Sequence, residues 1–196
     1  MNTKRYSGYI IGGIIVVLVI FFIVSFNSLV KKEEKVKLQW NEVQNTYQRR
    51  LDLIPSLVNV VKGVANYEQT VLQELIDARA KASAVNITGT DVTSDQYQQQ
   101  TKAQDDLAKS ANKIIISIEK YPDIQGTKAF VGLQTQLEGT ERRIKVARKD
   151  FNDAIQLYNS AVRSFPVSIT GKLFGFKAKE GFSSDAGAEK VTEIKF

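Results

Sequence analysis

Residues 130–165 read FVGLQTQLEGTERRIKVARKDFNDAIQLYNSAVRSF, and this stretch predicts one long amphipathic helix. A large apolar or aromatic residue returns every seven positions, in the order Phe130, Leu137, Ile144, Phe151, Tyr158 and Phe165. A second position of the repeat holds mainly small residues, namely Leu133, Thr140, Ala147, Ala154 and Ala161. Large residues beside small ones let neighbouring helices interdigitate. Pro166 is expected to end this helix, because proline lacks the N–H that a helix needs.

Two further helices are predicted upstream of residue 85. The first has apolar residues at three- and four-residue steps: Leu29, Val36, Trp40, Val43, Tyr47 and Leu51 or Ile54. Pro55 is expected to interrupt it, or to begin the next helix at its first position. The second runs from about Ser56 to Ala84, and its seam holds Leu57, Val61, Val64, Glu68, Val71, Leu75, Ala78 and Ala82.

A further helix is predicted from about Ser94 to Tyr121, after a turn-rich linker at residues 86–94, with Ser94 or Asp95 as its cap. Its seam reads Tyr97, Thr101, Gln104, Ala108, Ala111, Ile115 and Ile118, and the glutamines at 98–100 predict a poorly buried start. Four amphipathic helices on short links predict an all-α fold, an antiparallel up-and-down four-helix bundle. A homo-oligomeric coiled coil is the alternative, but short links favour packing within one chain.

An uncharged apolar run, YIIGGIIVVLVIFFIVSF, occupies residues 9–26, and the apolar character resumes at Leu29 and Val30. About 20 such residues match a hydrocarbon core of about 30 Å, so Tyr9 to Val30 is predicted to be a single transmembrane helix. A cleaved signal peptide is the competing interpretation, but the run is long and no small-x-small site follows it. Lysines at 31, 32, 35 and 37 outnumber Lys4 and Arg5, which favours a cytoplasmic domain.

The composition excludes several classes of site. The chain has no cysteine and no histidine, so thiol nucleophiles, disulfides, thiolate zinc sites and Ser-His-Asp arrangements cannot form. It contains no P-loop and no GxGxxG motif. A net charge of +6 suits a surface beside anionic lipid. The basic residues are scattered among acidic ones, however, which argues against nucleic-acid binding. We therefore expect no catalytic residues, no cofactor and no metal.

Glu68 is the one charged residue in an otherwise apolar seam. A carboxylate there must be paired, or its pKa must rise until it is protonated. The candidate partners are arginines, which can satisfy both carboxylate oxygens, and they are Arg49, Arg50, Arg142 and Arg143. The prediction is a buried ion pair that fixes helix register. A seam that drifts and exposes Glu68 is one alternative, and a functional carboxylate is the other.

Short motifs along nearly the whole chain resemble the LemA family. They are Asn27-Ser28-Leu29-Val30, Trp40, RRLDLIPSLV at 49–58, Val61-Lys62-Gly63, Glu68, Ala78-Arg79, Glu119-Lys120-Tyr121-Pro122-Asp123, Leu133 to Leu137, Thr140-Glu141, Arg148, Phe151-Asn152, Tyr158-Asn159 and Phe165-Pro166. Phe151 departs from the tyrosine expected there. The resemblance implies a bacterial, membrane-anchored four-helix bundle of bromodomain-like arrangement without assigned catalysis. It also implies relatives of which some serve in membrane organisation.

The predicted organisation is a short flank at 1–8, the anchor at 9–30, a helical LemA-like domain at 31–166 and a Gly/Phe-containing tail at 167–196 with a disordered end. We expect a scaffold or adaptor of the bacterial plasma (inner) membrane that acts through contacts with unknown membrane or envelope proteins. Self-assembly into a homo-oligomer that organises membranes is the alternative. An enzyme using Glu68, Glu119 and Asp123 is a remote one.

Overall fold

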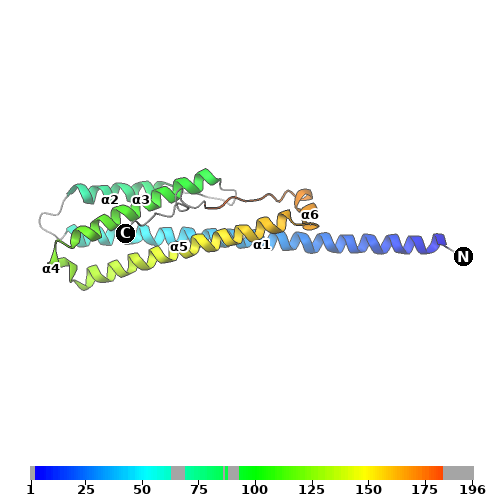
Figure 1. The fold of residues 1–196 in the computed structure, drawn as a ribbon, viewed down its shortest axis with the longest axis horizontal. Coiled ribbons are helices and arrows are strands. Elements are labelled where there is room, and N and C mark those ends of the chain that lie inside the picture. Colours follow the sequence, from blue (N-terminus) through cyan, green and yellow to red (C-terminus); the bar gives the residue numbers. More distant parts are fainter. Residues whose placement is uncertain (1–2, 63–68, 86, 88–92, 183–196) are drawn as a thin grey trace, which may run out of the picture. The chain divides into compact units, whose positions relative to one another are not determined.

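The computed structural model describes residues 3–62, 69–85, 87 and 93–182, and within these ranges the protein is all-α, as predicted (Figure 1). The helices are α1 (Thr3–Lys62), α2 (Gln69–Ala84), α3 (Ser94–Ile118), α4 (Pro122–Gln125), α5 (Lys128–Arg163) and α6 (Val167–Leu173). The described residues form two compact units. The anchor unit comprises residues 1–39 and 153–179, and the core unit comprises residues 40–152 and 180–196.

In the anchor unit, α1 begins with a segment that is long enough and apolar enough to cross a membrane. Its apolar side chains face outward, and Ile14, Val17 and Ile20 are each more than half exposed. Burial begins at Ser25 and Leu29 and continues at Val36. The helix thus changes from an outward-facing apolar surface to one with a buried stripe near the end of the 9–26 run.

In the core unit, four helices contribute to one hydrophobic core. They are α1, α2, α3 and α5, and their core residues are Leu51, Ile54, Leu57, Val58, Val61, Val71, Leu75, Ala78, Ala82, Leu107, Ala111, Ile114, Ile118, Phe130, Leu133 and Leu137. The seams predicted for the first two helices are confirmed wherever they are described. Val64 and Glu68 lie outside the described residues.

The predicted break at Pro55 is wrong, because Pro55 lies inside α1, which continues to Lys62. The helix expected from Ser56 is therefore divided, with its first residues in α1 and the rest in α2. Proline removes the N–H that would bond the carbonyl four residues earlier, at Leu51. Arg79 of α2 supplies a donor instead, with Nε 3.2 Å from that carbonyl oxygen.

The start of α3 also differs from the prediction. Thr93, not Ser94 or Asp95, caps the helix, in a capping box with Gln96. Gln98 and Gln99 are exposed, as the predicted poorly buried start requires, whereas Gln100 is 2% exposed because its side chain exchanges two hydrogen bonds with Gln44. Leu107 and Ile114 are fully buried, whereas the predicted seam residues Ala108 and Ile115 are only partly so. The helix ends at Ile118 rather than Tyr121, before the short helix α4.

The seven-residue repeat of α5 is confirmed from Phe130 to Tyr158, whose large members are all buried. Its last member is an exception: α5 ends at Arg163, and Phe165 is 83% exposed. The tail then forms α6 and an extended stretch up to Phe182. The disordered end predicted for the tail falls at residues 183–196, outside the described residues.

Candidate functional site

A row of polar side chains crosses the interior of the core unit, and Arg50 is its buried charged member. Arg50 is 2% exposed, and its Nη1 donates to the backbone oxygen and to Oε1 of Gln104, at 2.8 and 3.0 Å. Its Nη2 lies 2.6 Å from both carboxylate oxygens of Glu141. Arg50 therefore joins α1 to α3 and α5 through charge-assisted bonds.

The four arginines predicted as partners of Glu68 differ in burial. Of the four arginines, Arg50 alone is buried, whereas Arg49, Arg142 and Arg143 are exposed on their helices. Glu68 lies outside the described residues, so its predicted pairing stays a prediction. The partner that sequence reasoning missed is Glu141, which stands four residues before Lys145 and so has the spacing of an ordinary surface ion pair. The available signal was its place directly after the seam residue Thr140, where a long side chain can reach inward.

A second polar group joins the same three helices at Arg148. Its Nε donates to the hydroxyl oxygen of Tyr47 at 2.8 Å, and its Nη2 lies 3.0 Å from Asp105 Oδ1. Burial raises the pKa of the Tyr47 phenol above its ordinary value, although Arg148 opposes this. Burial by itself would lower the pKa of Arg148, but Tyr47 and Asp105 together hold it above its ordinary value. Tyr47 is thus a neutral acceptor for a permanently charged guanidinium.

The polar row follows a three-residue step along α1, at Gln44, Tyr47 and Arg50. Gln44 bonds Gln100, and Arg50 bonds Gln104, while Tyr47 is linked to Asp105 through Arg148. Side chains bonded in this way are directed toward one another rather than toward solvent. The row holds α1 and α3 in one register.

Two asparagines of α5 each bind a residue of the tail by its backbone. In the core unit, Asn152 donates to the carbonyl of Phe182 at 3.1 Å and accepts its N–H at 3.0 Å. In the anchor unit, Asn159 makes the same pair of bonds to Lys179, both at 2.8 Å. The residue before each asparagine contacts the side chain of the bound residue: Phe151 meets Phe182, and Tyr158 meets Lys179. The Phe151-Asn152 and Tyr158-Asn159 motifs are therefore tail clamps.

The clamped Phe182 completes an aromatic cluster in the core unit. Its ring centroid lies 6.0 Å from that of Trp40, 5.3 Å from Tyr97 and 5.5 Å from Phe151. Trp40 and Tyr97 are themselves 4.9 Å apart in an edge-to-face arrangement, which aromatic pairs favour. The cluster explains the single tryptophan as a packing residue.

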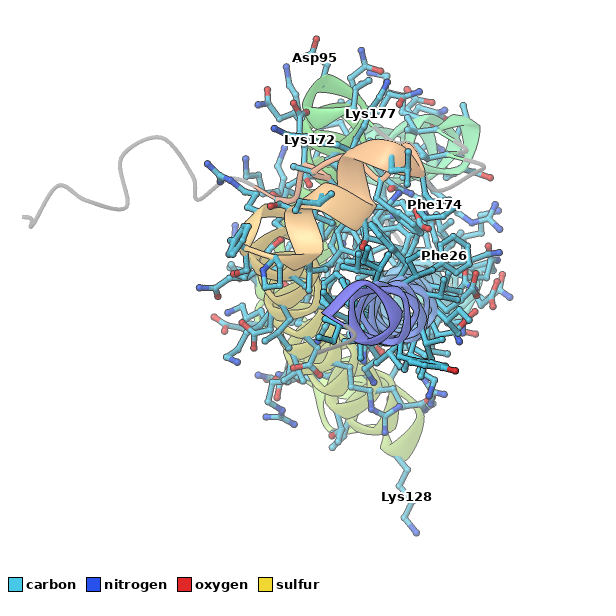
Figure 2. The ribbon with its side chains drawn as sticks, turned by 90° about the vertical axis from the view of Figure 1, so that its right-hand side faces the viewer. Phe26, Asp95, Lys128, Lys172, Phe174 and Lys177 are labelled. Carbon is cyan, nitrogen blue, oxygen red and sulfur yellow. The ribbon has the colours of Figure 1, made fainter. Side chains whose placement is uncertain are left out.

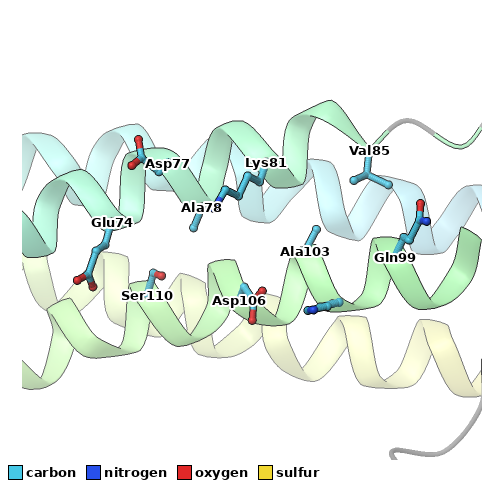
Figure 3. A pocket seen from close by; sticks show the side chains of 10 residues that line it. Glu74, Asp77, Ala78, Lys81, Val85, Gln99, Ala103, Asp106 and Ser110 are labelled. Carbon is cyan, nitrogen blue, oxygen red and sulfur yellow. The ribbon is translucent and has the colours of Figure 1, made fainter.

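An open groove lies between α2 and α3 (Figure 3). Its volume is about 570 Å³. Small side chains, Ala78 and Ala103, lie between the helices, and charged ones of both signs surround them. The lining residues are Glu74, Asp77, Ala78, Lys81, Val85, Gln99, Lys102, Ala103, Asp106 and Ser110. At one edge Glu74 pairs with Lys113 at 2.6 Å. A floor of small residues with a charged margin is suited to contact with another helix.

The acids considered for chemistry do not form a cluster in the part of the chain that the structure describes. Glu119 ends α3 and Asp123 lies in the first turn of α4, and both are exposed. Among the same residues, no three acids stand close enough to hold a metal ion.

Comparison with known proteins shows the family of this chain. The model of the LemA family matches residues 39–196. Magnetosome protein MamQ 2 of Paramagnetospirillum magneticum is 22% identical over 185 residues, which cover 86% of this chain and 68% of that protein. Protein LemA of Metamycoplasma hominis is 21% identical over 139 residues, or 71% of this chain and 60% of that protein. Because the family model covers well over half of the sequence, this chain belongs to the LemA family.

Proposed function

We propose that this protein is a membrane-anchored scaffold or adaptor of the bacterial cell envelope, acting through protein–protein contacts and without catalysis. Residues 9–30 cross the plasma membrane once. The helices that follow pack as an antiparallel up-and-down four-helix bundle of bromodomain-like arrangement. The domain carries the groove between α2 and α3 as its contact surface.

One observation carries the proposal: Arg50 and Arg148 inside the core unit are bonded to residues of other helices, while the groove between α2 and α3 remains open. Arg50 and Arg148 are engaged by partners on other helices and hold the fold together. The groove offers Ala78 and Ala103 as a low floor, with Asp77 and Lys102 among its charged residues. This suits an amphipathic helix of a second protein, with small residues in the groove and charges of both signs beside them.

The lysines that follow the anchor support a cytoplasmic domain. The chain has no cysteine, so one introduced thiol reports its own position. A Val146→Cys variant should react with a membrane-impermeant maleimide only after spheroplasts are lysed. Labelling of intact spheroplasts would contradict the cytoplasmic placement.

A photo-crosslinking amino acid in the groove tests the adaptor function. Lys102 and Arg142 are both exposed helical cations, but only Lys102 lines the groove. With the crosslinker at 102, irradiation of native membranes should yield a discrete adduct with another protein, identified by mass spectrometry. The same group at 142 is the matched control and should not yield that adduct. Ala103→Trp, which fills the groove, should abolish it, whereas Val146→Trp should not.

Adducts between copies of this chain alone would contradict the adaptor function and favour the self-assembling, membrane-organising alternative. An adduct that persists in the Ala103→Trp variant would place the contact elsewhere than the groove. No adduct from residue 102 would likewise contradict the proposal.

A further inference from the structure

The short helix α6 turns its small residues inward and its apolar residues outward. Thr170 is fully buried, and Gly171 lies beside Val162 of α5. In contrast, Ile169 and Leu173, four residues apart on α6, are 49 and 67% exposed, and Phe165 just before the helix is 83% exposed. Phe174 adds a ring that is 52% exposed. This is the reverse of an ordinary surface helix, which hides its apolar side.

Ring contacts hold this apolar surface at the end of the anchor run. The ring of Phe26 lies 5.0 Å from that of Phe174 and 5.6 Å from that of Phe176. Gly175, with φ of 78°, lets the chain turn so that Phe176 N–H bonds the carbonyl of Gly171 at 2.9 Å. Figure 2 shows Phe26 and Phe174 close together. All of these residues belong to the anchor unit.

Phe26 lies near the membrane boundary. It ends the apolar run at 9–26 and stands about one helical turn before Val30, the last residue of the predicted anchor. A surface that contacts Phe26 therefore lies within about one helical turn of the headgroup level. Aromatic side chains are favoured at this level.

Basic residues accompany the apolar ones. Lys172, next to Leu173, and Lys177, in the stretch after α6, are both exposed residues of the anchor unit (Figure 2). Lys31 and Lys35 are exposed on α1 just beyond Phe26. The acidic Glu33 is paired with Lys179 at 3.0 Å, which offsets its charge. Lysines near an anionic bilayer surface add attraction and can extend their charged ends toward headgroups.

We propose that α6 and its flanking rings form a second membrane contact, lying in the headgroup region of an anionic bilayer. The surface consists of Phe165, Ile169, Leu173 and Phe174, with Lys172 and Lys177 beside it. The inference rests on the anchor of the proposed function, because contact with Phe26 sets its level. It does not depend on the adaptor function or on the groove.

Site-directed spin labelling of the full chain in nanodiscs with anionic lipid tests the proposal. One cysteine at a time is introduced, as Leu173→Cys, Phe174→Cys, Val17→Cys or Val146→Cys, and labelled with a nitroxide. Collision with oxygen, which concentrates in lipid, is compared with collision with a water-soluble nickel reagent. Residues 173 and 174 should favour oxygen, between the strong preference at 17 and the nickel preference at 146. Val146 is the matched control, an apolar side chain 58% exposed on α5.

The outcomes separate the two proposals. A lipid signal at 17 with a water signal at 173 and 174 overturns the second contact and leaves the anchor intact. A water signal at 17 overturns the anchor and this inference together. Dipolar broadening between labels at 173 overturns the inference in favour of contact with a second copy.

The charge contribution has its own test. Replacing the anionic lipid with a zwitterionic one should shift label 173 toward the nickel reagent. The double variant Lys172→Gln and Lys177→Gln should shift it in anionic discs as well. Insensitivity of label 173 to both changes would overturn the anionic part of the proposal.

Discussion

Arg79 donates its Nε–H to the backbone carbonyl of Leu51, the carbonyl that Pro55 leaves without a helical donor. In an unbroken α-helix that carbonyl would accept the N–H of residue 55, which proline lacks. The 3.2 Å contact from α2 supplies the missing bond. Helix α1 thereby continues to Lys62 and brings Leu57 and Val61 into the core. The RRLDLIPSLV and Ala78-Arg79 motifs therefore act together: the first leaves a carbonyl without its helical donor, and the second supplies a donor.

The first prediction is that the cost of losing Arg79 depends on Pro55. Arg79→Ala should lower the free energy of unfolding by about 1 kcal/mol, because a hydrogen bond to a partly buried carbonyl is lost. In a Pro55→Ala background, residue 55 can bond Leu51 itself, so the same change should cost less. Denaturant unfolding of the four proteins of this cycle, followed by circular dichroism in detergent, measures the difference.

Arg49→Ala is the control for removing an exposed cation from a helix, and it should change stability little in either background. If Arg79→Ala lowers the free energy of unfolding equally with and without the Pro55→Ala change, Arg79 does not replace the missing N–H of residue 55.

Much of this fold could be predicted from the spacing of apolar residues. The repeat from Phe130 to Tyr158 is buried as expected, and so is the stripe from Leu29 to Ile54. Such patterns are readable because a helix face recurs at a fixed period. The assignment of Phe165 to this helix was wrong, because the seven-residue period continues in the sequence after the helix ends at Arg163.

The misses arise where a partner distant in sequence decides the outcome. Pro55 is tolerated because of Arg79, and Gln100 is buried because of Gln44. Glu141 is a core partner because Arg50 meets it 91 residues away. The two residues of each pair are far apart in the sequence, so a pattern confined to one helix cannot show that they meet. The long apolar start of α1 was predictable, but the contact between Phe26 and the tail was not, because no sequence period links them.

The second prediction concerns the ion pair within the core. Glu141→Ala should destabilise the protein by about 2 kcal/mol, because it leaves the buried guanidinium of Arg50 without its carboxylate. The exposed neighbour Glu138 is the matched control, and Glu138→Ala should change stability by no more than about 0.5 kcal/mol. Thermal unfolding of both variants provides the comparison. Similar losses of stability in the two variants would mean that the ion pair between Arg50 and Glu141 does not stabilise the core.

The third prediction concerns alkaline pH. Burial raises the pKa of Tyr47, so the folded protein keeps a proton that the unfolded chain releases near its ordinary value of 10.0. The stability due to this group is therefore complete below pH 10 and decreases as pH rises toward the folded pKa. Tyr47→Phe cannot titrate, although it loses the bond from Arg148. The gap in unfolding free energy between wild type and variant should narrow from pH 9 to 11. A constant gap would contradict the raised pKa.

The fourth prediction concerns the tail clamp in the anchor unit. Asn159→Ala removes both bonds to the backbone of Lys179, one of which protects its amide. Hydrogen exchange at Lys179 should accelerate, whereas exchange at Phe182, held by Asn152, should change less. Asn159→Asp is an informative comparison, because its carboxylate can still accept the N–H but cannot donate to the carbonyl. Unchanged exchange at Lys179 in the alanine variant would mean that Asn159 does not hold the tail.

Alkaline carbonate extraction of native membranes tests the central claim most directly, namely that residues 9–30 anchor an otherwise water-facing helical protein in the bilayer. The full chain should remain in the membrane pellet through the carbonate wash and enter solution only with detergent, because about 20 apolar residues cannot leave lipid without exposure to water. Recovery of the full chain in the carbonate supernatant would contradict the account.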